Sequence, residues 1–259
     1  MRAHKIALAI GALLAGPVAM ATPILPGSGP SDVFVVVWNT NTGSAGIGDT
    51  VVQALPETAS QVVSGGAASF SIDGSLSQLE TDLGTSSASD LDFAVVAGNA
   101  NTLSTLQWGS TLSSITNVTT KTQVNNAAGT LNGWLGNVYN TLPSGSTSNV
   151  VAIGASNSTL EAAASASPFN STNGQIFASA FSGTAAAGTS LEFFQAVANN
   201  TGKAGGATVT DLAGSWSFNL ATDSASFAPP SSVPLPAAAW LLMSGLVGFL
   251  GLGRRRAAV

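Results

Sequence analysis

The sequence of 259 residues contains no cysteine, and its only histidine, His4, lies near the N-terminus. Without cysteine the chain can form neither a disulfide nor a thiolate metal site, so an exported form must be held together by its core alone. Without another histidine, the rest of the chain lacks the commonest general base and the commonest neutral metal ligand. A serine–histidine–aspartate catalytic site is therefore excluded from that part of the chain.

Basic residues are also scarce. Seven occur, and five of them lie at the two ends of the chain, at Arg2, Lys5, Arg254, Arg255 and Arg256. Residues 22–233 keep only Lys121 and Lys203 against all twelve acidic residues, so this stretch of 212 residues carries a formal charge of −10. Such a surface has little with which to neutralise phosphates, which disfavours nucleic acid as a partner. Anionic lipid or acidic polysaccharide would need a bridging cation.

The N-terminus has the pattern of a signal peptide spanning residues 1–21. A positive stretch is followed by an uncharged, mostly apolar run, Ile6–Leu14. Small residues then stand at Ala19 and Ala21, the positions that a signal peptidase reads, and cleavage would leave Thr22 as the new N-terminus. The alternative is a retained membrane anchor, which the shortness of the apolar run disfavours.

The C-terminus combines three features: a proline-rich box, an apolar run at 237–253 and a basic cluster at 254–256. The box consists of Val233, Pro234, Leu235 and Pro236. As a helix, the apolar run would be about 25 Å long, slightly less than a hydrocarbon core of about 30 Å. We expect a transmembrane helix whose arginines, Arg254, Arg255 and Arg256, stay in the cytoplasm.

This tail resembles the PEP-CTERM sorting signal, in the variant whose box reads VPLPA. The resemblance covers residues 233–256, and Leu235 stands where the commoner box has glutamate. It implies an exported protein of an exopolysaccharide-producing Gram-negative bacterium, inserted transiently in the inner membrane with its body outside. It also implies that an exosortase recognises the box and cuts near it, either releasing the body or transferring it to another carrier, so that the body reaches the cell surface or the medium. The alternative is a permanent single-span anchor.

The body between these signals is predicted to be one mainly β domain, an antiparallel β-sandwich-like fold at 22–224. A spacer at 225–232 would join it to the sorting signal at 233–259. Short apolar and β-branched islands predict strands. They are Asp32–Trp38, Thr50–Leu55, Ser69–Ile72, Leu91–Ala97, Asn149–Ile153, Gln175–Phe181, Leu191–Val197 and Ala207–Thr210. Trp216, Phe218 and Leu220 alternate with polar residues, as do Ala225 and Phe227, which predicts a closing hairpin with one buried face.

Two segments break this pattern and predict amphipathic helices. Apolar residues recur at steps of three or four over Val124–Leu142, and Pro143 ends the run. A shorter helix is expected at Ser75–Leu83, with Leu76, Leu79 and Leu83 on one side.

The densest acidic patch of the body comprises Glu80, Asp82, Asp90 and Asp92. Asp90 and Asp92, two residues apart, would share a strand face, where two carboxylates repel each other unless solvent or a cation intervenes. A calcium ion, which prefers oxygen ligands, is the one cofactor that this patch leaves open. The same residues could serve as the acid/base pair of a glycan hydrolase. A solvated acidic edge is the simpler interpretation.

Aromatic side chains offer a second candidate site, because their rings can stack on sugars. Trp134 and Tyr139 lie on the apolar stripe of the predicted helix and are expected in the core. Trp108 is the remaining candidate for binding carbohydrate.

These observations favour a structural or adhesive protein of the cell surface, biofilm or exopolysaccharide matrix rather than an enzyme. Signal peptidase, an exosortase and exopolysaccharide are the expected partners. A calcium- or carbohydrate-binding module and a carboxylate-based glycan hydrolase are the alternatives.

Overall fold

The structure is a computed structural model, and it describes most of the body of the chain. The described residues are 23–27, 29–43, 46–100, 104–110, 120–144, 146, 148–154, 156–157, 159–162, 184–199 and 205–230. Several predictions concern residues outside these ranges. They are the signal peptide with its cleavage site, the strand at Gln175–Phe181, the box at Val233–Pro236, the helix at 237–253 and the arginines at 254–256.

The described body is mainly β. Its strands are β1 (Asp32–Asn39), β2 (Thr50–Thr58), β3 (Ala68–Ser71), β4 (Leu91–Asn99), β5 (Thr105–Ser110), β6 (Val150–Ile153), β7 (Ala185–Ala186), β8 (Ser190–Ala198), β9 (Ala207–Asn219) and β10 (Ser224–Ala228). Its helices are α1 (Ala59–Gly65), α2 (Leu76–Leu83) and α3 (Lys121–Tyr139), with short 3-10 turns η1 (Ala88–Asp90) and η3 (Leu220–Thr222). Among the described residues, no helix is long and apolar enough to cross a membrane.

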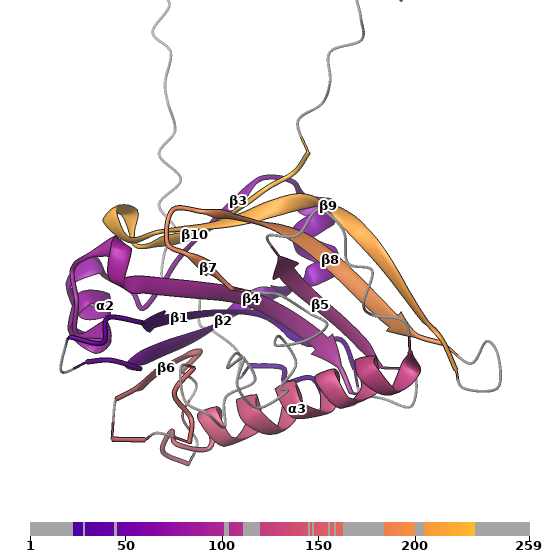
Figure 1. Ribbon diagram of the computed structural model, residues 1–259, viewed down its shortest axis with the longest axis horizontal. Coiled ribbons are helices and arrows are strands. Elements are labelled where there is room, and N and C mark those ends of the chain that lie inside the picture. The colour runs from indigo at the N-terminus through magenta and orange to yellow at the C-terminus, as the bar shows by residue number, and fades with distance from the viewer. Residues whose placement is uncertain are drawn as a thin grey trace, which may run out of the picture. The chain divides into compact units, whose positions relative to one another are not determined.

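All of these strands belong to one antiparallel sheet with the order β3-β10-β9-β8-β5-β4-β1-β2-β6, and β7 pairs beside β4. Figure 1 shows that the sheet curls strongly, so that β9 and β10 arch over the strands in its middle. The prediction of a mainly antiparallel β fold is confirmed. The expected sandwich differs from this arrangement, because a continuous ladder runs from β3 to β6 and the curl takes the place of a second sheet.

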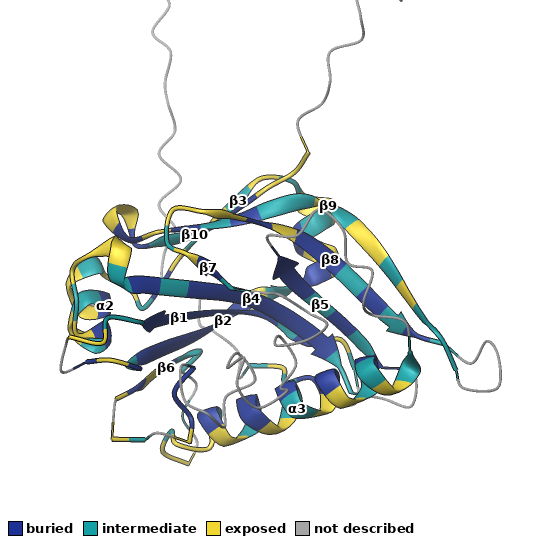
Figure 2. Cartoon of the chain, in the orientation of Figure 1, coloured by how far each residue is buried: buried dark blue, intermediate teal, exposed yellow. Residues whose placement is uncertain are grey.

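The curled sheet has a hydrophobic core on each face. Figure 2 shows that much of β1, β2, β4 and β5 is buried. We call the two cores the α3 core, in which α3 packs on the sheet, and the α1–α2 core, in which α1 and α2 pack on the opposite face. Side chains of β1 alternate between them, with Val33, Val35 and Val37 in the α1–α2 core and Phe34, Val36 and Trp38 in the α3 core. β1 is therefore buried on both faces, as its continuous apolar run requires.

Helix α3 confirms the predicted long amphipathic helix and begins three residues earlier than expected. Thr120 caps it, because the hydroxyl accepts from the backbone N–H of Gln123 and the Gln123 side chain accepts from the backbone N–H of Thr120. Trp134 and Leu135 are buried against the sheet, and Tyr139 packs against the same core. Helix α2 is also confirmed, capped by Ser75 and ended by Gly84.

The closing hairpin is confirmed, but β9 is much longer than the strand predicted at Ala207–Thr210. It continues to Asn219 through an irregularity in its pairing with β8, where Ala213 has φ 54° and donates its N–H to Asp211 Oδ1 at 2.7 Å. The bulge at Ala213 allows β9 to continue, although the sequence pattern predicted two separate strands there. Trp216 is fully buried beside Phe227, with ring centroids 5.3 Å apart.

The body extends beyond the predicted boundary at residue 224. Strand β10 runs through Ala228, and Ala225 and Phe227, placed in the predicted spacer, are buried in the α1–α2 core. The first compact unit of the chain ends at Pro229, and Pro230–Val259 forms a separate unit. The expected spacer is therefore shorter, since its first residues are needed to complete the sheet.

Candidate functional site

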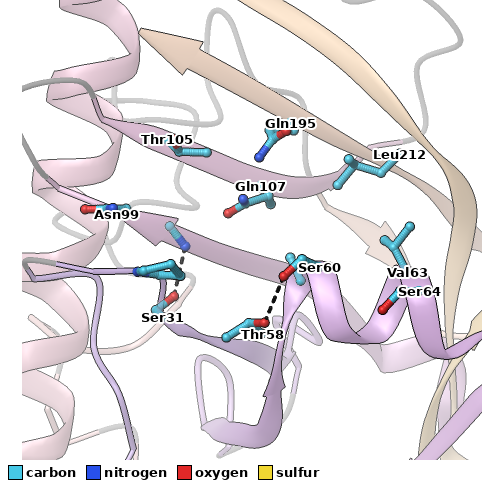
Figure 3. Close-up of a pocket in the computed structure, with 13 residues that line it drawn as sticks. Ser31, Thr58, Ser60, Val63, Ser64, Asn99, Thr105, Gln107, Gln195 and Leu212 are labelled. Atoms are coloured by element: carbon cyan, nitrogen blue, oxygen red, sulfur yellow. Dashed lines mark hydrogen bonds between the residues drawn. The ribbon is translucent and has the colours of Figure 1, made fainter.

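A cleft of about 410 Å³ opens between helix α1 and the end of the sheet (Figure 3). Strands β4, β5, β8 and β9 provide one wall, α1 provides the other, and the segment before β1 closes one end. Its lining residues are Pro30, Ser31, Thr58, Ala59, Ser60, Val63, Ser64, Gly98, Asn99, Thr105, Gln107, Gln195 and Leu212.

The polar wall of the cleft follows from strand register. Gln107 lies opposite Gln195, which in turn lies opposite Thr210 on β9. Residues opposite each other in a ladder share a face, so these three side chains form one row. Their neighbours Leu106 and Trp108 point the other way into the α3 core. Gln107, Gln195 and Thr210 therefore lie on the same face of the sheet as the α1–α2 core. At this end of the strands, that face is polar instead of apolar.

Helix α1 forms the opposite wall and is held rigidly at its start. Thr58 ends β2 and caps α1 through a capping box with Gln61, so the chain turns directly from strand to helix. Ala59 and Val62 are buried, while Ser60 and Ser64 line the cleft (Figure 3). This helix was not predicted. The signal that could have found it is Thr58 followed three residues later by Gln61.

The closed end of the cleft is fixed by hydrogen bonds to Ser31, which is almost fully buried. Its hydroxyl accepts from Gly98 N–H at 2.9 Å and donates to the Asp32 carbonyl at 2.8 Å. Nearby, Asn99 Oδ1 is shielded from solvent and has no hydrogen-bond partner among the described residues. The closed end of the cleft is thus preorganised by the hydrogen bonds of Ser31.

None of the described residues that line the cleft carries an ionisable side chain. Within the described ranges, the amides of Gln107 and Gln195 make no side-chain hydrogen bond, so both can donate and accept toward the cleft. Apolar surface comes from Ala59, Val63 and Leu212. The arrangement suits an uncharged ligand that has many hydroxyls and some apolar surface.

Trp108, the predicted carbohydrate-binding residue, is fully buried in the α3 core. Its ring packs on Phe194 with centroids 6.1 Å apart. The prediction that it stacks on a sugar is wrong, because a side chain without exposed surface cannot meet a ligand. Trp134 and Tyr139 lie in or against the same core, as expected.

Asp90 and Asp92 do not share a strand face. Asp90 ends the turn η1 and accepts from Asn41 Nδ2 at 2.9 Å and Thr85 Oγ1 at 3.1 Å. Asp92 lies in β4 opposite Trp38, and burial raises the pKa of its carboxyl. Neither lines the cleft. The turn separates them, because the strand begins only at Leu91.

Asp82, predicted to belong to the acidic patch with Asp90 and Asp92, interacts instead with Asp73. Burial, followed by a hydrogen bond with Asp82 and repulsion from Asp82 and Asp223, raises the pKa of Asp73 to about 7. Asp223 is 6% exposed and accepts from Ser71 Oγ at 3.1 Å. In the ranges that the structure covers, no group of three or more His, Cys, Asp or Glu is arranged to hold a metal ion.

Comparison with known proteins found no match: no family model, no curated protein and no solved structure resembles this chain significantly. The function must therefore be argued from the residues themselves.

Proposed function

We propose that this chain is an exported protein of the cell surface or extracellular matrix, and that its body works by binding rather than by catalysis. Its ligand is a segment of neutral polysaccharide held in the cleft between α1 and the sheet. The observation that carries this proposal is the described lining of the cleft, which combines hydroxyl and amide groups with small apolar patches and contains no ionisable side chain.

The chemistry of a neutral sugar matches this lining. Each sugar hydroxyl both donates and accepts a hydrogen bond, as do the amides of Gln107 and Gln195 and the hydroxyls of Ser60 and Thr105. The C–H faces of a sugar ring need apolar contact, which Val63 and the other apolar lining residues supply. The charge of −10 on residues 22–233 opposes acidic polymers, so a neutral chain is the better partner.

The two ends of the chain support export. In this proposal, signal peptidase cuts between Ala21 and Thr22, and the segment at 237–253 holds the chain in the inner membrane with its body outside. An exosortase then acts at Val233–Pro236 and transfers the body to the cell surface or the medium. The support for these steps is the pattern of residues at the two ends.

Binding can be tested by calorimetry with neutral hexasaccharides of glucose and galactose, using the full-length protein in detergent. We expect saturable binding to at least one of them and none to a hexamer of uronic acid. Gln107→Ala and Gln195→Ala should each weaken binding about fivefold, because each removes a hydrogen bond worth about 1 kcal/mol.

Gln78→Ala is the matched control, because Gln78 lies on α2, does not line the cleft, and donates from its side-chain amide to Asp82. This variant should bind as the unmodified protein does. Absence of binding to every neutral sugar, or equal affinity in the cleft variants and the control, would contradict the proposal.

A further inference from the structure

Glu161 carries a buried carboxylate that no described residue pairs with. Its side chain is 7% exposed, and its Oε1 atom is shielded from solvent and receives no hydrogen bond from the described residues. An ionised carboxylate is costly to bury unless a cation or several donors compensate its charge. Lys121 is the only basic residue in the described ranges, and it packs against Gly205 rather than here. Among the described residues nothing compensates the charge of Glu161, so it needs a partner beyond them or a proton.

A second carboxylate, that of Asp49, interacts electrostatically with Glu161. Asp49 ends the tight turn that begins at Gly46, where its N–H donates to the Gly46 carbonyl at 3.0 Å. Burial and the negative charge of Asp49 both raise the pKa of Glu161. Two acidic groups thus meet at the turn that leads into β2.

Glycines make the room for both carboxylates. Gly48 has φ 89°, and a Cβ at that position would lie 2.5 Å from Glu161 Oε2. A Cβ at Gly46 would lie 2.6 Å from Asp49 Oδ2. Side chains at these two positions would collide with the carboxylates, so the turn is shaped around them.

The segment that carries Glu161 is fixed by hydrogen bonds. Ala162 N–H donates to Thr50 Oγ1 at 2.9 Å, and the same hydroxyl donates to the Gly48 carbonyl at 2.6 Å. Glu161 N–H donates to the Asn157 carbonyl at 3.2 Å. The carboxylate of Glu161 and the Gly46–Asp49 turn are thereby held in register before any ligand arrives.

We propose that Asp49 and Glu161 bind one calcium ion, with main-chain oxygens and water completing its ligands. Calcium accepts six to eight oxygen ligands in flexible geometry, whereas magnesium requires a near-ideal octahedron. The ion would neutralise the buried carboxylate and clamp the start of β2 to the segment before residue 162. This site is separate from the cleft and does not depend on the saccharide proposal.

The test uses the full-length protein in detergent, treated with a chelator and then titrated with calcium chloride. Calorimetry should show one ion bound per chain, and about 10 mM calcium should raise the melting temperature by several degrees. The same concentration of magnesium should have a much smaller effect. Glu161→Gln keeps the shape of a protonated glutamate, and it should abolish both the binding and the rise.

Asp49→Asn gives an independent variant that should behave in the same way, and Glu57→Gln, which removes one negative charge elsewhere, should keep the full response. The proposal is overturned if the unmodified protein melts at the same temperature with calcium and with chelator. It is also overturned if Glu161→Gln and Asp49→Asn retain the response. The first result would mean that calcium does not neutralise Glu161, and the second would mean that calcium binds elsewhere.

Discussion

At the scale of single residues, the described carboxyl groups with shifted pKa values all shift upward. Besides Asp73, burial is the largest cause for Asp32, Asp92 and Asp223. A carboxyl whose pKa is higher in the folded than in the unfolded chain binds its proton more tightly when folded. Protonation therefore stabilises the fold, in contrast to most proteins, whose paired carboxylates favour neutral pH.

Asp73 should dominate this pH dependence, because its pKa reaches about 7. Its stabilisation is complete below the unfolded pKa, near 4, and is lost as the pH rises through 7. We expect the free energy of unfolding to be larger at pH 5 than at pH 8, and Asp73→Asn to reduce that difference by on the order of 1 kcal/mol, after allowance for solvent screening. Urea unfolding followed by tryptophan fluorescence at several pH values measures it.

The control for this prediction is Glu57→Gln, which removes a carboxylate other than Asp73, Asp82 and Asp223. In this variant the difference in the free energy of unfolding between pH 5 and pH 8 should remain. A stability that rises from pH 5 to pH 8 in the unmodified protein would contradict the prediction.

Trp108 provides a second residue-scale prediction. Because it fills the α3 core, Trp108→Ala should cost about 3–5 kcal/mol of stability. Trp108→Phe keeps most of the packing and should bind neutral saccharide with the same affinity as the unmodified protein. Calorimetry on the Phe variant checks this, and a selective loss of saccharide binding in a fully folded protein would reinstate Trp108 as a ligand-binding residue.

At the scale of elements, sequence patterns predicted those segments whose local signal and tertiary environment agree. β1 shows a continuous apolar run and is buried on both faces, and α3 shows a helical stripe and packs by that stripe. The length of β9 was underestimated, because the bulge near Ala213 depends on pairing with β8 and leaves no local signal in the sequence. Helix α1 has only seven residues, too few for a periodic signal, so its capping residue Thr58 is the sole local cue.

The cap of α3 permits a prediction at this scale. Thr120→Ala removes the hydroxyl that accepts from Gln123 N–H and should lower the free energy of unfolding by about 1 kcal/mol. Thr120→Ser retains that hydroxyl and should lose only a few tenths of this amount. Chemical unfolding of the two variants side by side measures the difference, and an equal loss in both would show that the cap contributes nothing.

At the scale of the whole molecule, the arrangement of strands could not be predicted from local patterns. Alternation shows that a strand has a buried face, but it does not show whether that face meets a second sheet or the same sheet after it has curled. The cleft has the same origin, because Ser31, Ser60, Gln107 and Gln195 are far apart in sequence and meet only through the sheet order. None of them belongs to a motif, so no sequence signal marked the site.

The boundary between the body and the predicted sorting signal at 233–259 is also a feature of the whole molecule. The compact unit ends at Pro229, and the box at Val233–Pro236 follows after a few residues. A cut near the box would leave β10 and its buried Phe227 intact. Processing at this position would therefore release a complete body.

Intact-mass analysis of the protein from its native host, with and without the exosortase, tests this claim most directly. The account predicts a mature chain that begins at Thr22 and ends near Val233 when the enzyme is present. Without the enzyme, the chain should still end at Val259. A C-terminus at Val259 in both strains would contradict the account and leave a plain membrane anchor.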